Sequence, residues 1–144
     1  GVQNVSFEGH TNDVAGIWRN HHALILASRA EGMPLALVEA MMCGRPGIVT
    51  RVGGNAELIE DGVTGFLAAP VEDSLDAALE DAWARRHELH DIGRLAASKV
   101  RELIPPNPAE QFADMLLNIA DELADVKASR TVRDLESSTA GSKR

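Results

Sequence analysis

The segment 28–70 begins with SRAEGMP (28–34) and continues with LALVEAMMCGRPGIVT (35–50) and RVGGNAELIEDGVTGFLAAP (51–70). The apolar run 23–27 before it is typical of a strand that is buried on both faces of a parallel sheet. Pro34 is tolerated at the first position of a helix, because the N–H that it lacks would have no partner there. Gly44 and Pro46 then end this helix, which we expect over about 35–42. The pattern predicts strand, loop, helix, strand, Gly-Gly loop, short helix and strand.

The junction between the polar loop and the helix predicts an anion site. The first turn of a helix leaves N–H groups without intrahelical partners and carries a partial positive charge. We expect four amides to point outward, those of Gly32, Met33, Leu35 and Ala36, whereas Pro34 has no donor. Gly32 also lets a ligand approach the backbone closely. Such a junction is well suited to a phosphate or diphosphate.

Two carboxylates flank this junction. Glu31 lies just before the helix and Glu39 lies inside it, with seven residues between them. Helical side chains tilt toward the N-terminus, so Glu39 should lean toward the junction. A carboxylate repels a diphosphate, so both are better placed to accept hydrogen bonds from hydroxyl groups. The set predicts a ligand with a diphosphate in the middle and hydroxyl-rich groups at both ends, as in a nucleotide-sugar.

The segment resembles the nucleotide-sugar half of retaining GT-B glycosyltransferases, the group 1 or family 4 type with a Glu-x7-Glu motif. The resemblance rests on an ordered set of positions: Ser28, Glu31, Gly32, Pro34, Val38, Glu39, Ala40, Met41, Gly44, Pro46, Gly53, Gly54, Glu57, Ile59, Asp61, Gly62, Gly65, Phe66 and Leu67. It covers about 5–71 well, and 73–126 only as generic terminal helices. It implies a metal-independent transferase of the hexosyltransferase class.

The resemblance also implies roles for single residues. Glu39 would bind the ribose hydroxyls of the donor, and Glu31 would lie near the transferred sugar as the catalytic residue. The donor's diphosphate or sugar would be bound by Gly32, Met33, Pro34 and Leu35, with Gly53 and Gly54 close by. The alternative for Glu31 is a carboxylate that only balances the helix dipole, and for Glu39 a solvated residue on a helix face.

Composition narrows the function class. The net charge is −8 over 144 residues. Residues 128–144 carry four Lys or Arg and two Asp or Glu, so the body 1–127 stands at −10. An acidic body with few aromatic residues argues against nucleic-acid binding. These residues contain no signal-peptide pattern and no apolar run long enough to span a membrane, so we expect a cytoplasmic protein.

The sequence predicts neither a metal site nor a cofactor; the nucleotide-diphosphate sugar would be the substrate. His10, His21 and His22 are close in sequence but match no known ligand spacing. His87 and His90 lie beside acidic residues, which is typical of a solvated surface. The lone Cys43 follows a helix and is interpreted as a packing residue.

The rest of the chain predicts one more strand and several helices. We expect a strand over 2–7 and then a helix to about residue 19, capped by Thr11 or Asn12. A helix capped by Asp73 should have four buried residues, Leu75, Leu79, Ala82 and Trp83. A further helix should span 92–103. Another should follow it, with Asn107 as its cap, Pro108 in its first turn and Glu110 at its third position. This last helix has an apolar stripe made of Phe112, Met115, Leu116, Ile119, Leu123 and Val126.

The order of elements predicts an α/β fold, a partial Rossmann-like parallel sheet with C-terminal helices. Residues 1–127 would form part of a C-terminal GT-B domain and 128–144 a disordered tail. The resemblance implies two earlier strand–helix units with an Arg and a Lys for the diphosphate, and an N-terminal domain for the acceptor, which could lie at a membrane surface. Neither is expected in these residues, which suggests a fragment or one part of a split protein.

Three functions remain open at this point. The first is retaining transfer of a glycosyl group from a nucleotide-sugar to an acceptor. The second is a non-catalytic segment that binds a nucleotide-sugar or regulates through it. The third is a structural domain with a degenerate site, against which the presence of both glutamates counts.

Overall fold

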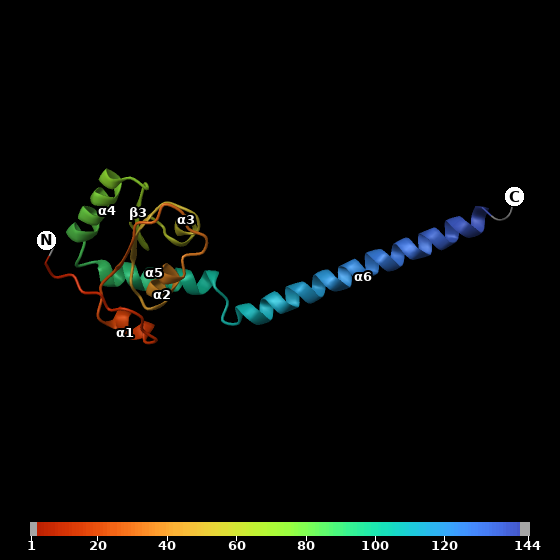
Figure 1. Cartoon of the computed structure of the whole chain (residues 1–144), viewed down its shortest axis with the longest axis horizontal. Helices are drawn as coiled ribbons and strands as arrows, with labels where there is room; N and C mark the ends of the chain where they lie inside the picture. The colour runs from red at the N-terminus through yellow and green to blue at the C-terminus, as the bar shows by residue number, and fades with distance from the viewer. Residues whose placement is uncertain (1–2, 142–144) are drawn as a thin grey trace. The chain divides into compact units, whose positions relative to one another are not determined.

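The computed structural model describes the backbone of residues 3–141 and the side chains of 3–124, 126 and 127 (Figure 1). The chain divides into two units, Gly1–Ile104 and Pro105–Arg144. Within the described backbone, the first unit contains the sheet and five helices, and the second contains one helix.

The sheet of the first unit has three parallel strands in the order β1-β2-β3. They are β1 (Leu24–Leu26), β2 (Gly47–Thr50) and β3 (Gly65–Ala68). Leu24 pairs with Gly47, and Gly47 pairs with Gly65. The expectation that 23–27 and 46–50 form neighbouring parallel strands is therefore confirmed. Parallel neighbours need a crossover connection, and the helix after β1 supplies it.

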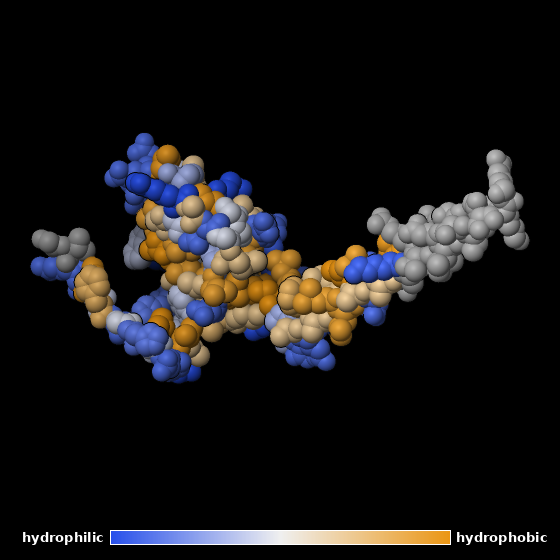
Figure 2. All heavy atoms as spheres, turned by 45° about the vertical axis from the view of Figure 1, so that its right-hand side comes forward, coloured by the Kyte–Doolittle hydropathy of each residue, from blue (hydrophilic) through white to orange (hydrophobic). Residues whose placement is uncertain are grey.

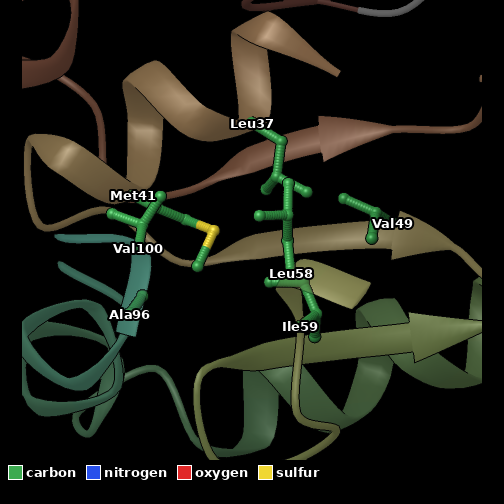
Figure 3. Close-up of a cluster of buried hydrophobic side chains, with 7 residues drawn as sticks. All are labelled: Leu37, Met41, Val49, Leu58, Ile59, Ala96 and Val100. Atoms are coloured by element: carbon green, nitrogen blue, oxygen red, sulfur yellow. The ribbon is translucent and has the colours of Figure 1, made fainter. Parts of the chain in front are cut away.

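Two helices bury one face of this sheet. They are α2 (Leu35–Met42) and α5 (Leu89–Leu103), which contact each other. A cluster of buried side chains lies between these helices and the strands, and Figure 3 shows them pointing toward one another: Leu37, Met41, Val49, Leu58, Ile59, Ala96 and Val100. Leu58 ends the short helix α3 (Asn55–Leu58). This cluster fixes α2, and with it the loop that precedes α2.

The other face of the sheet is covered by α4 (Glu72–Ala84). Successive strand residues point to opposite faces, so Ile48 lies on this side while Val49 lies on the other. Ile48 packs with Phe66, Ala82 and Ile92. The expected α/β architecture, helices against a parallel sheet, is confirmed.

Several local expectations are wrong. Residues 3–10 form no strand, and Phe7 is 96% exposed, because their alternation has no neighbouring strand or covering helix to satisfy. The first helix is α1 (Val14–Arg19), and its cap is Asp13, whose side chain accepts from the Gly16 N–H. Asp13 takes the capping position that was expected of Thr11 or Asn12, because its carboxylate reaches the first free amides of the helix.

The fourth helix also differs from its prediction. It begins at Glu72 without a side-chain cap, so Asp73 lies inside its first turn. Ala82 is buried, but Trp83 is 67% exposed and its ring contacts the guanidinium of Arg86. One position on a helix turns the side chain by about 100°, which takes Trp83 off the buried face.

The second unit is α6 (Pro108–Gly141). Its start agrees with the predicted signals, because Gln111 N–H donates to the Asn107 carbonyl and Asn107 Nδ2 donates to Glu110. The helical backbone continues through 128–141, where the sequence predicts a disordered tail; the side chains there and residues 142–144 lie outside the described residues. The segment contains no proline and its single glycine is Gly141, so nothing in it interrupts a helix.

The apolar stripe of α6 predicts self-association. Figure 2 shows apolar side chains along the coloured part of this helix, and among the described residues of this unit no other helix or strand covers them. Five of them recur in alternate steps of four and three residues, and each is about half exposed: Phe112, Leu116, Ile119, Leu123 and Val126. Such spacing places them on one seam, as in a coiled coil of two copies.

We therefore expect the sedimentation coefficient of the chain to rise with concentration in the micromolar range. Leu123→Glu should abolish this rise, because it places a charge in the seam. Asn118→Glu adds the same charge outside the seam and serves as the control. A monomer at every concentration would remove this prediction.

Candidate functional site

The candidate site lies where β1 and β2 end. In an open parallel sheet, the loops that follow the carboxyl ends of the strands form the binding crevice. The loop after β1 carries Ser28 and Glu31, and the loop after β2 carries Gly53 and Gly54. The structure therefore brings the two predicted loops to one edge.

The two loops touch through the pair of glycines. Gly53 has φ +47°, and a Cβ at this position would lie 1.9 Å from the carbonyl oxygen of Glu31. A Cβ on Gly54 would lie 2.6 Å from the carbonyl oxygen of Gly32. The Gly54 N–H donates to that same carbonyl at 2.9 Å. Gly53 and Gly54 thus hold the loop of Glu31 by close backbone packing.

The start of α2 offers free amide donors. Within the described residues, no backbone hydrogen bond uses four of its amides as donors, those of Gly32, Met33, Leu35 and Ala36. Pro34 was expected at the first position of the helix but takes the capping position before it. Its carbonyl accepts from the amides of Leu37 and Val38. Met33 and Leu35 are exposed, whereas Pro34 is buried. The free amides and the dipole of α2 make this junction suitable for an anion.

Glu39 lies on the solvent side of α2. Residues four apart on a helix share a face, so Glu39 lies on the same face as Leu35, and both are exposed. Leu37, Ala40 and Met41 on the opposite side are fully buried. In the described residues the Glu39 carboxylate makes no hydrogen bond or ion pair, and it is available to a ligand.

Glu31 is partly buried and is held by neighbouring polar groups. The Ser28 hydroxyl donates to Glu31 Oε1. The Thr50 hydroxyl donates to the Ser28 carbonyl at 2.6 Å, and Asn55 Nδ2 donates to the Thr50 carbonyl at 2.8 Å. No role was predicted for Thr50 or Asn55 from the sequence; a hydroxyl directly after the buried residues 47–49 is the signal that could have indicated one.

The arginines near the loops have different environments. Arg45 Nε donates to the Trp18 carbonyl at 2.6 Å and so joins α1 to the turn after α2. Arg51 lies 3.9 Å from Asp61 in a mostly exposed ion pair. Arg29, beside Ser28, makes no ion pair with any described residue. Among the described residues, Arg51 is thus paired with a carboxylate, whereas Arg29 and Arg45 are not.

A hollow of about 170 Å³ lies at the same edge, lined by Ser28, Arg29, Thr50 and the start of α4. It is smaller than the ~300–1,000 Å³ of most ligand pockets, so it would enclose only part of a nucleotide-sugar. A larger hollow of about 420 Å³ lies between β1 and α4 and is mostly apolar. It contains none of the predicted site residues and supplies few donors for a diphosphate.

The described residues contain neither a metal-binding cluster nor a membrane-spanning helix. No three His, Cys, Asp or Glu side chains gather there in a way that would hold a metal ion. None of the described helices combines the length and apolar character needed to cross a membrane.

A parallel sheet with helices on both faces, and with loops gathered at the carboxyl ends of its strands, defines a Rossmann-like domain. The chain belongs to the glycosyl transferases group 1 family, whose model matches residues 1–85. The structural neighbours are GT-B enzymes, so the predicted fold class and family are confirmed.

Curated relatives share parts of this sequence. The chain is 36% identical over 94 residues to the Vi polysaccharide biosynthesis protein VipC/TviE of Salmonella typhi, covering 65% of this chain and 16% of that protein. It is 38% identical over 90 residues to a D-inositol 3-phosphate glycosyltransferase of an Arthrobacter species, covering 59% of this chain and 20% of the relative. The chain thus spans a fifth or less of these two relatives.

Solved structures resemble the fold. HepE from Anabaena, in complex with UDP and glucose, matches with a TM-score of 0.70 and 26% identity over 81% of this chain and 32% of that one. Sucrose-phosphate synthase from Thermosynechococcus elongatus matches with a TM-score of 0.68 and 23% identity, over 74% of this chain and 27% of that one. The second likeness shows the fold alone.

Proposed function

We propose that this segment binds a nucleotide-diphosphate sugar and takes part in retaining transfer of its glycosyl group. The observation that carries the proposal is the junction at the start of α2, where free amides lie beside the loop of Glu31 and that loop is packed on Gly53 and Gly54. The amides suit a diphosphate, and the two carboxylates suit hydroxyl groups on either side of it. HepE in complex with UDP-glucose, at 26% identity, supports this ligand class.

The proposed roles follow the placement of each group. Glu39 accepts hydrogen bonds from the ribose, since its carboxylate is exposed and unengaged. Glu31 is the catalytic residue and faces the transferred sugar. The diphosphate is bound by the amides of Gly32, Met33 and Leu35, with Pro34 ordering the turn.

Catalysis in this proposal is electrostatic and independent of a metal. Amides that are already oriented stabilise charge developing on the departing diphosphate and need no reorganisation at that moment. The retaining outcome and the hexosyl class follow from the family resemblance. A separate domain would bind the acceptor, which could be held at a membrane surface; the cytoplasmic location also stays a prediction.

Titration with UDP and UDP-glucose tests the proposal. A ligand at about 100 times its Kd stabilises the folded state by about 2.7 kcal/mol. For a domain of this size, that should raise Tm by roughly 10 °C or more. Mannose 6-phosphate, which has a sugar and a phosphate but no diphosphate, is the control and should produce little shift. A Tm unchanged by either uridine nucleotide would exclude the proposal.

A second candidate is a segment that binds the donor without turning it over. The short span favours it, because the chain covers a fifth or less of the length of these two relatives. A donor-hydrolysis assay separates the two. Release of free glucose from UDP-glucose supports catalysis, whereas binding without release supports the second candidate.

A further inference from the structure

We infer that Ser28 and Thr50 are positioning residues that orient the Glu31 carboxylate toward the donor sugar. The inference deepens the proposed function and rests on it. It comes from a chain of hydrogen bonds that runs from the buried interior to this carboxylate.

The first link joins Ser28 to Glu31. The Ser28 hydroxyl donates to Oε1, and no other side-chain hydrogen bond to Glu31 occurs among the described residues. One carboxylate oxygen is therefore engaged, while Oε2 stays available to a ligand. A glutamate on a loop samples many rotamers, and restricting it before the ligand arrives lowers the entropy lost on binding.

The second link joins the loop to β2. The pairing of β1 with β2 ends at Leu26 and Val49, so no ladder bond fixes Ser28. The Thr50 hydroxyl substitutes for that ladder by donating to the Ser28 carbonyl at 2.6 Å; the Leu26 carbonyl is farther, at 3.5 Å. Thr50 is 3% exposed, so water does not compete effectively for this bond.

The third link fixes β2 itself at this point. Asn55 is fully buried, and its Nδ2 donates to the Thr50 carbonyl at 2.8 Å. Its Oδ1 has no hydrogen-bond partner among the described residues, which costs stability. The bond from Nδ2 to Thr50 is therefore the hydrogen bond that this side chain contributes. The loop of Glu31 is thus tied at both ends, at Ser28 by Thr50 and at Gly32 by the Gly54 amide.

The test compares the affinities of the chain for UDP and UDP-glucose by calorimetry. UDP contains the diphosphate and the ribose but no sugar for Glu31, so the ratio of the two Kd values reports on Glu31. Ser28→Ala should leave Kd for UDP within about twofold and weaken UDP-glucose about fivefold. Thr50→Val should act in the same direction, and Thr50→Ser, which keeps the hydroxyl, should restore the ratio.

Two matched controls separate positioning from general damage. Ser6→Ala removes an exposed bond of the same kind, from the Ser6 hydroxyl to Glu8 at 2.8 Å. Thr64→Val removes another buried hydroxyl, from a residue that is 4% exposed and accepts from the Glu60 N–H at 2.8 Å. Both should leave the ratio unchanged, although Thr64→Val should lower Tm about as much as Thr50→Val.

The outcomes distinguish this inference from the proposed function. If the unmodified chain binds neither ligand, the proposed function fails and the inference fails with it. If it binds both and Ser28→Ala leaves the ratio unchanged, only the inference is overturned. An equal change of the ratio in Thr64→Val also overturns it, because the effect would then reflect general loss of stability.

Discussion

Glu31→Gln should lower kcat about 10²-fold in a full-length enzyme that contains this segment, while KM for the donor changes by less than about threefold. Positive charge develops on the transferred sugar as its bond to the leaving group stretches. A carboxylate therefore stabilises the transition state more than it stabilises the ground state. Glutamine keeps an oxygen that accepts from Ser28, so the loop stays in place and only the charge is lost. Steady-state kinetics with varied donor measure the effect.

Glu39→Gln should show the opposite emphasis. The ribose hydroxyls are present in substrate and transition state alike, so the loss should weaken donor binding by about 1–3 kcal/mol and appear mainly in KM. Glu80→Gln, at an exposed position of α4, is the control and should change neither constant. Intact turnover in Glu31→Gln, together with abolished turnover and unchanged donor affinity in Glu39→Gln, would reverse the assigned roles.

Gly53→Ala should destabilise the first unit by about 2–6 kcal/mol and remove the Tm shift with UDP. The new Cβ would occupy a positive φ of +47° and lie 1.9 Å from the Glu31 carbonyl oxygen. Strain of this kind and overpacking each cost about 1–3 kcal/mol. The two loops must separate to relieve the contact, which moves the backbone of Glu31 and Gly32. Chemical denaturation measures the free energy of unfolding.

Gly9→Ala is the matched control for this effect. Gly9 also has a positive φ, +66°, but a Cβ there would have no atom within 4 Å. Its cost should be limited to the strain, about 1–2 kcal/mol, with no change in ligand response. Equal losses of stability in the two variants would show that the close approach of the loops contributes nothing.

The sequence was sufficient for elements whose signals are local. Pro34, Gly44 and Pro46 bracket a helix that forms over Leu35–Met42. The N–H that Pro34 lacks and the positive φ of Gly44 each act within one helical turn, so the sequence shows them directly. The apolar runs before and after it predict the strands for the same reason. The local signals failed at 3–7, where a strand needs a partner that alternation alone does not supply, and at Trp83, where one helical position separates a buried face from solvent.

The features of the candidate site also divide into those that the sequence predicts and those that only the tertiary structure brings together. Glu31, Glu39 and the amides of the α2 start are readable from the sequence, because motif spacing and helix-end chemistry depend on neighbours along the chain. The contact of Gly53 with the Glu31 carbonyl, and the path from Asn55 through Thr50 and Ser28 to Glu31, depend on residues up to 27 positions apart. Only the parallel pairing of β1 with β2 brings those residues together, because it places the two strand ends, and the loops that follow them, at one edge of the sheet.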